Sequence, residues 1–144
     1  MAEKELRFTF RPQPSYGFFW VEFEGDFDMQ RLGLAYGEFI SHPDYYPGID
    51  ELLDFSKSTL EELTVEDIAR LKAFTEARPE LRNNKSVIVV NSALEYQLAE
   101  TLKVHMQKTI PVDRHICFSV REAIEWLRPE QADEINAKLL RSQT

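Results

Sequence analysis

The sequence predicts an α/β fold with a mixed five-stranded sheet, in the order β-β-α-β-α-β-α-β-α, followed by a short C-terminal helix. Two apolar runs joined by a short link begin the chain and favour an antiparallel hairpin. A strand, a polar cap and a helix then follow one another three times, which is typical of right-handed crossovers between parallel strands. The chain has 144 residues, 43% of them hydrophobic. That is enough for the core of one domain.

The first strand is predicted from residues 6–11, where apolar and polar side chains alternate with the period of a strand that has one wet face. After the turn PQPSYG, the run YGFFWVEF from Tyr16 to Phe23 predicts the second strand. The first helix should end before Pro43. Its apolar side chains recur at helical spacing: Met29, Leu32, Tyr36, Phe39 and Ile40.

The three later strands are predicted from IDELLDF, SVIVVN and RHICF. The caps that follow them are Thr64 with Asp67, Ser92 with Glu95, and Ser119 with Glu122. A hydroxyl placed three residues before an acid satisfies free N–H groups at a helix start. Apolar stripes follow these caps: Val65, Ile68, Leu71 and Phe74; Leu94, Leu98, Leu102 and Met106; Val120, Ala123, Ile124 and Leu127.

Two of these segments predict particular core residues. SVIVVN is apolar on both faces, so Val87 to Val90 should lie in a central strand. Leu98 and Leu102, on the helix that follows, should be buried. Residues 1–128 then form the α/β domain. Residues 129–144 add a C-terminal helical extension that begins at Pro129 and packs on the same domain.

Composition restricts the partners and the location that we expect. The net charge of -8, from 17 basic and 25 acidic residues, repels a phosphate backbone, so no nucleic acid is expected as a partner. No run approaches the roughly 18 apolar residues of a membrane span, and the N-terminal MAEKELRFTF lacks the apolar core of a signal peptide. Cys117 is the only cysteine, which indicates a buried thiol and a reducing cytoplasm.

The carboxyl edge of the sheet is where ligands bind in open α/β folds. The sequence predicts a turn there, from Asp54 to Thr59. The binding residues predicted at this edge are Ser56, Lys57, Ser58, Thr59, Asn91, Ser92 and Ser119. The turn either cradles an anion or is a solvated turn, and the second interpretation is favoured because no glycine-rich loop accompanies it. Thr64 is either a phosphoacceptor or an N-cap, and the cap is favoured.

Histidines and aromatic residues are the other candidates for a site. His42, His105 and His115 lack a metal-ligand spacing, so no metal and no cofactor are expected. His42 is expected to bond the last carbonyls of the first helix. Four aromatic residues could form an exposed interaction surface: Phe18, Trp20, Tyr45 and Tyr46. The alternative is that the C-terminal helix covers the second strand.

The segments VEFEGDF, HPDYYPGIDELLDFS, LTVEDIARL, KSVIVVNSALEYQLAETL and ICFSVREAIEWL resemble STAS-like domains, the anti-sigma-factor-antagonist type, and among these an uncharacterised bacterial branch. The resemblance covers most of the chain and implies the fold predicted above. The better-known antagonists carry Asp-Ser-Ser-Gly at the second helix and are switched by phosphorylation of a serine there. Ungapped counting from Asp54 places Glu62, Leu63, Thr64 and Val65 on that motif, so only the hydroxyl of Thr64 remains.

The function expected from these observations is that of a non-enzymatic regulatory or protein-interaction module, with a protein partner or with self-association as a homodimer. The alternative is a carrier or sensor of a small apolar or lipid-like ligand, by analogy with related folds. A hydrolytic enzyme comes third, because no nucleophile with a base is recognisable. A large internal pocket would favour the ligand carrier, and a flat aromatic face without a cavity would favour the interaction module.

Overall fold

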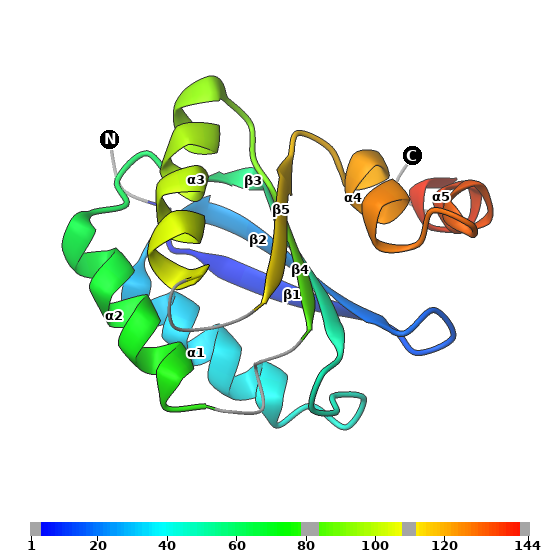
Figure 1. The fold of residues 1–144 in the computed structure, drawn as a ribbon, viewed down its shortest axis with the longest axis horizontal. Helices are drawn as coiled ribbons and strands as arrows, with labels where there is room; N and C mark the ends of the chain where they lie inside the picture. Colours follow the sequence, from blue (N-terminus) through cyan, green and yellow to red (C-terminus); the bar gives the residue numbers. More distant parts are fainter. Residues whose placement is uncertain (1–3, 79–83, 108–111, 142–144) are drawn as a thin grey trace.

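The computed structural model describes residues 4–78, 84–107 and 112–141 and contains one five-stranded sheet (Figure 1). The strands follow one another across the sheet in chain order, β1-β2-β3-β4-β5. The first two form an antiparallel hairpin at one side, and the other neighbouring pairs are parallel. The predicted fold class, a mixed sheet with helical crossovers and a C-terminal helix, is confirmed.

The helices and strands follow one another in the predicted order. The strands are β1 (Arg7–Gln13), β2 (Phe18–Asp26), β3 (Asp50–Thr59), β4 (Lys85–Val89) and β5 (Asp113–Cys117). The helices are α1 (Met29–Ile40), α2 (Val65–Glu76), α3 (Ala93–Gln107), α4 (Val120–Leu127) and α5 (Ala132–Arg141). The strand that was expected to be central, β4, lies inside the sheet between β3 and β5, and β3 is the middle strand.

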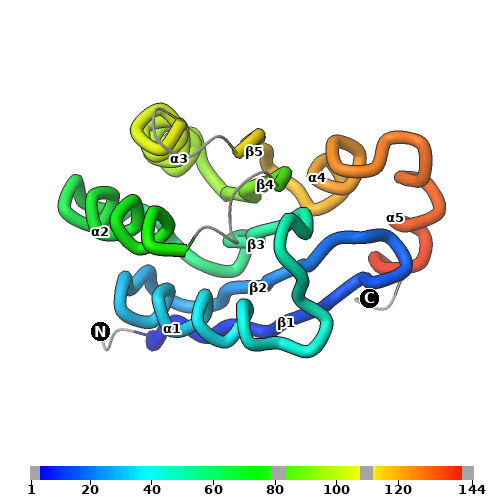
Figure 2. Tube along the Cα trace, turned by 60° about the horizontal axis from the view of Figure 1, so that its bottom comes forward, coloured from blue at the N-terminus to red at the C-terminus, as the bar shows by residue number. Residues whose placement is uncertain are grey.

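The helices cover both faces of the sheet, as Figure 2 shows: α1, α2 and α3 lie on one face, and α4 and α5 lie on the other. Phe18 and Trp20 are buried under α4 and α5, against Ile124, Leu127 and Ile135. The prediction that these two aromatic residues form an exposed interaction surface is therefore wrong. The alternative, coverage by the C-terminal helix, is correct because Ala132 and Ile135 of α5 belong to the same core cluster as Phe18 and Trp20.

Strand β3 continues through the segment that was predicted as a turn. After an irregularity between Glu22 and Glu24, β2 pairs with β3 through Lys57, Ser58 and Thr59. The prediction of a turn from Asp54 to Thr59 is wrong because β2 runs on to Asp26 and offers these residues a backbone partner. Serine and threonine fit a strand when such a partner is present.

The predicted helix starts are confirmed by their hydrogen bonds. Thr64 and Asp67 form a complete capping box, in which the Thr64 hydroxyl accepts the N–H of Asp67 at 3.1 Å. Ser92 and Ser119 accept the N–H groups of Glu95 and Glu122, each at 3.1 Å. These caps form locally because each involves residues only three positions apart.

Helix α3 presents a different face to the core from the one predicted. Leu94 is exposed, and Leu98 and Leu102 are only half-buried, whereas Glu95, Ala99 and Met106 are buried. Over the first turns of α3 the buried face is thus shifted by one residue, or about 100° around the helix, whereas Met106, the last member of the predicted stripe, is buried as expected. The shift follows from Glu95, whose carboxylate accepts the N–H of Leu60 at 2.7 Å and so must point inward.

Candidate functional site

The predicted anion site at residues 56–59 does not exist as a turn, and its polar groups bond within the sheet. The Lys57 ammonium lies 3.4 Å from a carboxylate oxygen of Glu22 on β2. The Ser58 hydroxyl donates to the carbonyl of Gly25 at 2.7 Å, and the Thr59 hydroxyl accepts the N–H of Glu61 at 3.2 Å. The half-buried Ser56 donates its N–H to Asp54 at 2.9 Å. These contacts make the segment part of the strand.

The other predicted edge residues do lie at the carboxyl ends of the strands, where they hold the edge together. The side-chain amide of Asn91 donates to the carbonyls of Phe55 and Ser58, at 3.0 and 3.2 Å, and so ties the end of β4 to β3. Ser92 and Ser119 cap α3 and α4. Thr64 is held in its capping box, as the N-cap interpretation predicted.

Large apolar side chains are also exposed at this edge. Phe118 follows β5 and is 50% exposed, and its ring stacks on that of Tyr96 with centroids 5.3 Å apart. Leu94, in the first turn of α3, is 55% exposed, and Val65, in the first turn of α2, is 78% exposed. Sequence reasoning missed these residues as a group because each was assigned to an apolar stripe or to a strand.

The remaining predicted aromatic residues divide into one packed and one exposed ring. Tyr45 is half-buried and packs edge to face on Phe39, with centroids 4.9 Å apart. Tyr46 is exposed. Among Phe18, Trp20, Tyr45 and Tyr46, therefore, only Tyr46 offers a large exposed ring.

Each of the three histidines contacts another group of the protein. The Nδ1 atom of His42 accepts the N–H of Asp44 at 3.1 Å, so the expectation that this side chain bonds the carbonyls of α1 is wrong. His105 is exposed, with Nδ1 2.8 Å from the carbonyl of Thr101, and His115 stacks on Trp126. Within residues 4–78, 84–107 and 112–141, no group of three His, Cys, Asp or Glu side chains could hold a metal.

The Cys117 thiol is buried, and burial raises its pKa to about 11. The thiol, not the thiolate, is therefore the dominant form near neutral pH, and its burial agrees with the prediction from the sequence. The same described part of the chain contains no helix that is both long and apolar enough to cross a membrane.

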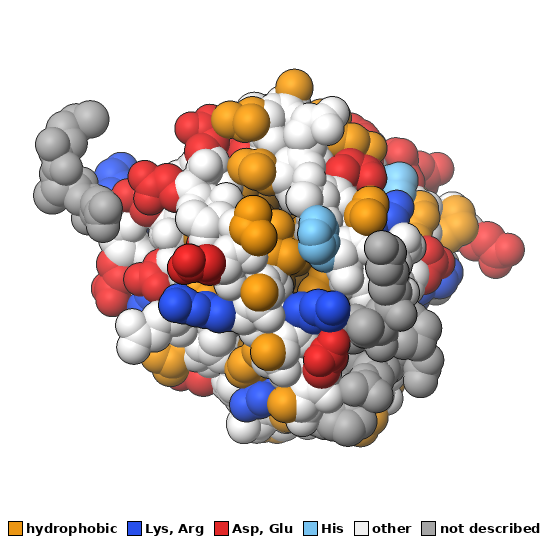
Figure 3. Space-filling view, turned by 60° about the vertical axis from the view of Figure 1, so that its left-hand side comes forward, with side chains coloured by type: hydrophobic (Ala, Val, Ile, Leu, Met, Phe, Trp, Pro, Cys, Tyr) orange, Lys and Arg blue, Asp and Glu red, His pale blue; other side chains and the backbone are white. Residues whose placement is uncertain are grey.

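A cavity of about 40 Å³ lies between the sheet and helices α1, α2 and α3. Figure 3 views the molecule from the side of α2 and α3 and shows hydrophobic side chains recessed in a hollow near the middle of this face. Most of the lining is apolar, including Leu53 and Ile88 from the sheet and Leu71 from α2. Its polar residues include Glu51, Ser86 and Arg114.

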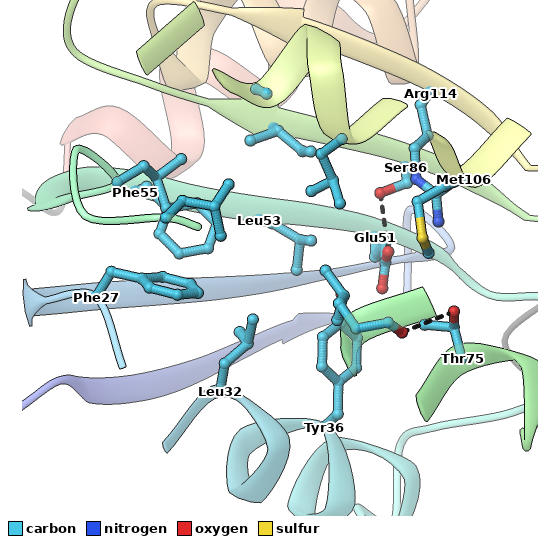
Figure 4. Close-up of a pocket in the computed structure, with 16 residues that line it drawn as sticks. Phe27, Leu32, Tyr36, Glu51, Leu53, Phe55, Thr75, Ser86, Met106 and Arg114 are labelled. Atoms are coloured by element: carbon cyan, nitrogen blue, oxygen red, sulfur yellow. Dashed lines mark hydrogen bonds between the residues drawn. The ribbon is translucent and has the colours of Figure 1, made fainter. Parts of the chain in front are cut away.

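These three polar residues come from neighbouring strands at one level of the sheet. The parallel register pairs Glu51 with Ser86, and Ser86 with Arg114. The Ser86 hydroxyl donates to Oε1 of Glu51 at 2.8 Å, as the dashed line in Figure 4 marks. Figure 4 also shows Phe27 and Phe55 at the opposite end of the cavity. The cavity thus has one polar end and one apolar end.

The surroundings of Glu51 change its acidity. Glu51 is only 4% exposed, and burial raises the pKa of its carboxyl group above the ordinary value of 4.5. The Ser86 hydrogen bond and the Arg114 charge counteract this effect only in part. Burial also raises the pKa of Tyr36, and the charge of Glu51 adds to that increase.

Sequence reasoning missed Glu51, Ser86 and Arg114, although one signal was present. The period of two along IDELLDF places Glu51 on the same face as Leu53 and Phe55, so the pattern alone puts an acid on an apolar face of the strand. Its partners could not be named before the register of β3, β4 and β5 was known.

A scan against protein-family models gives no match for this chain, and a search of curated proteins gives none either.

Proposed function

We propose that this chain is a non-enzymatic regulatory or protein-interaction module of STAS-like type, whose protein partner binds the carboxyl edge of the sheet. One observation carries the proposal: Val65, Leu94 and Phe118 are exposed large apolar residues, each at a junction between a strand and the following helix. Apolar surface exposed on a folded protein is stabilised when a partner covers it.

The chemistry of the edge supports binding over catalysis. The hydroxyls of Thr64, Ser92 and Ser119 accept helix N–H groups, and the Cys117 thiol is buried with a raised pKa. None of these groups is arranged as an activated nucleophile. The order of the elements and the hairpin at one side of the sheet agree with the STAS-like expectation. We place the protein in the cytoplasm, in keeping with its single buried cysteine.

The size of the cavity counts against the alternative function, a carrier of a lipid-like ligand. Pockets for ligands of drug size have volumes of about 300 to 1,000 Å³. The cavity here has about 40 Å³. A lipid-sized ligand would require α1, α2 or α3 to move away from the sheet.

The proposal is tested by comparing two exposed apolar positions, one at the carboxyl edge of the sheet and one towards the C-terminal end of α3. Phe118→Asp places a charge in the proposed interface. Val104→Asp is the matched control, since Val104 is 54% exposed and lies roughly 15 Å along α3 from Leu94. The tagged wild type and both variants are purified from native cells, and bound proteins are quantified by mass spectrometry. Sedimentation velocity on the same samples detects self-association.

The expected result is a partner, or a second copy of the chain, that is retained by the wild type and by Val104→Asp but lost from Phe118→Asp. Circular dichroism must show that both variants are folded. If the wild type and both variants retain the same proteins and sediment alike, the carboxyl edge is not the interface.

A further inference from the structure

The polar end of the cavity between the sheet and α1–α3 contains hydrogen-bonding atoms that the protein does not use. The Ser86 hydroxyl donates a hydrogen bond to Oε1 of Glu51, but Oε2 of the same carboxyl group is buried without a hydrogen-bond partner among the described residues. Nη1 of Arg114 is also buried and has no partner within the same ranges. The two side chains form no ion pair at or below 4.0 Å. An acceptor and a donor of opposite charge thus lie at one cavity without satisfying each other (Figure 4).

Such an arrangement is costly unless a third group satisfies both atoms, because a buried charge needs a partner with hydrogen bonds. A suitable group must accept a hydrogen bond from a guanidinium and also bond a carboxyl oxygen. Its remaining atoms must be apolar and few, since Leu53, Ile88 and Leu71 line the rest of the cavity.

We infer that the cavity binds a short-chain monocarboxylate of two or three carbons. One carboxylate oxygen accepts a hydrogen bond from Nη1 of Arg114. The other bonds with Oε2 of Glu51, and a single proton is held between the two carboxyl groups. Ser86 keeps the Glu51 carboxyl group oriented through Oε1. This inference concerns a site on the α1–α3 face of the sheet and goes beyond the proposed protein interface.

Charge favours a carboxylate over a neutral ligand. With one proton between them, Glu51 and the bound acid carry one negative charge, which balances the positive charge of Arg114. Guanidinium and carboxylate groups also form the stronger, charge-assisted type of hydrogen bond. The raised pKa of Glu51 supports the arrangement, because burial already favours the protonated form of this side chain.

Volume limits the length of the ligand. A water-sized group needs about 10 to 15 Å³ of cavity volume. The cavity of about 40 Å³ therefore accepts roughly three or four non-hydrogen atoms. Acetate has this size, propionate needs a small adjustment, and a longer chain should be excluded.

The proton makes binding depend on pH. The titratable or charged groups that act on Glu51 are Arg114 on β5, the adjacent Asp50 on β3 and Tyr36 on α1. Two hydroxyl groups also line the cavity, that of Ser86 on β4 and that of Thr75 on α2. The side chains that α3 contributes to the lining are apolar. Above the pKa of Glu51, binding takes up one proton, so the affinity for the anion should fall by about tenfold per pH unit.

The experiment measures the binding of propionate and of propionamide to the full chain in acetate-free buffer by saturation-transfer NMR. The two probes have nearly the same shape, but only propionate carries a charge. The variants are Arg114→Gln and Glu51→Gln, with Arg121→Gln on the exposed surface of α4 as the control. Circular dichroism checks the folding of each, and Arg114→Lys replaces Arg114→Gln if the latter does not fold.

We expect propionate to bind the wild type and Arg121→Gln equally, and to bind Arg114→Gln at least about tenfold more weakly, since a charge-assisted hydrogen bond is lost. Arg114→Lys, which keeps the charge but not the fork of donors, should also bind more weakly than the wild type. Glu51→Gln should bind propionate as the wild type does at low pH, because the amide can donate to the ligand. Its affinity should not decrease as the pH rises, because the variant has no carboxyl group at this position to deprotonate. Phe118→Asp, designed for the protein interface, should bind propionate like the wild type.

Several outcomes would overturn the inference. One is the absence of saturable propionate binding to the folded wild type. Another is equal affinity for propionate and propionamide, which would assign the site to a neutral ligand. Unchanged binding by a folded Arg114 variant, or tighter binding of hexanoate than of propionate, would place the ligand elsewhere.

Discussion

Glu95 connects three parts of the carboxyl edge, and Glu95→Ala should be among the most destabilising substitutions on α3. The buried carboxylate accepts the N–H of Leu60 at 2.7 Å and the N–H of Asn91 at 3.0 Å. Its own N–H donates to the hydroxyl of Ser92. The substitution would remove the acceptor of two backbone N–H groups. One is the buried N–H of Leu60, which precedes α2, and the other is the N–H of Asn91, which precedes α3.

The magnitude follows from these two bonds. A hydrogen bond to a charged group contributes about 1.5 to 3 kcal/mol to stability, so the loss of both should lower the free energy of unfolding by about 3 to 6 kcal/mol. Glu122→Ala is the matched control, because Glu122 holds the equivalent position of the α4 cap but is exposed. It should cost only about 0.5 to 1 kcal/mol.

Urea denaturation, followed by circular dichroism at equal protein concentration, gives the free energies of unfolding. Glu95→Gln adds a second check, since its amide oxygen can keep one of the two bonds and should restore part of the loss. If Glu95→Ala costs less than about 1 kcal/mol, or no more than Glu122→Ala, the carboxylate does not hold the edge and the rotation of α3 needs another cause.

Two further substitutions test local features of the helices. Met106→Ala should lower the free energy of unfolding by about 2 to 5 kcal/mol because Met106 is buried, and Leu98→Ala should cost less because Leu98 is half-buried. A larger cost for Leu98→Ala than for Met106→Ala in urea melts would show that Leu98 is buried, as the sequence predicted. Thr64→Ala should cost about 0.5 to 2 kcal/mol through loss of the capping box, whereas Thr64→Ser should be nearly neutral. A loss of the same size for both would show that the threonine methyl group, not the hydroxyl, stabilises this helix start.

Helix positions could be predicted because the interactions that set them are short in sequence. The Thr64 cap needs only Asp67, three residues away. The buried face of α1 follows from the spacing of Leu32, Tyr36 and Phe39. A helix encodes both its start and its apolar face within a few turns, so local pattern and final structure agree.

Strand ends and the rotation of a helix could not be predicted in the same way. Residues 56–59 form part of β3 because β2 extends to Asp26 and pairs with them. The local sequence of one strand does not specify where its partner strand ends. The rotation of α3 depends on a bond between Glu95 and Leu60, which lie 35 residues apart. In both cases the deciding partner is distant in the chain.

The sequence by itself determined the order of the elements, the hairpin and the helix caps. Only the tertiary structure decided that α4 and α5 cover Trp20, and that Glu51, Ser86 and Arg114 meet at one level of the sheet. The physical reason is the nature of sheet pairing. The period of a strand specifies which face a side chain occupies, but its neighbours on that face depend on the order and register of strands brought together by the whole fold.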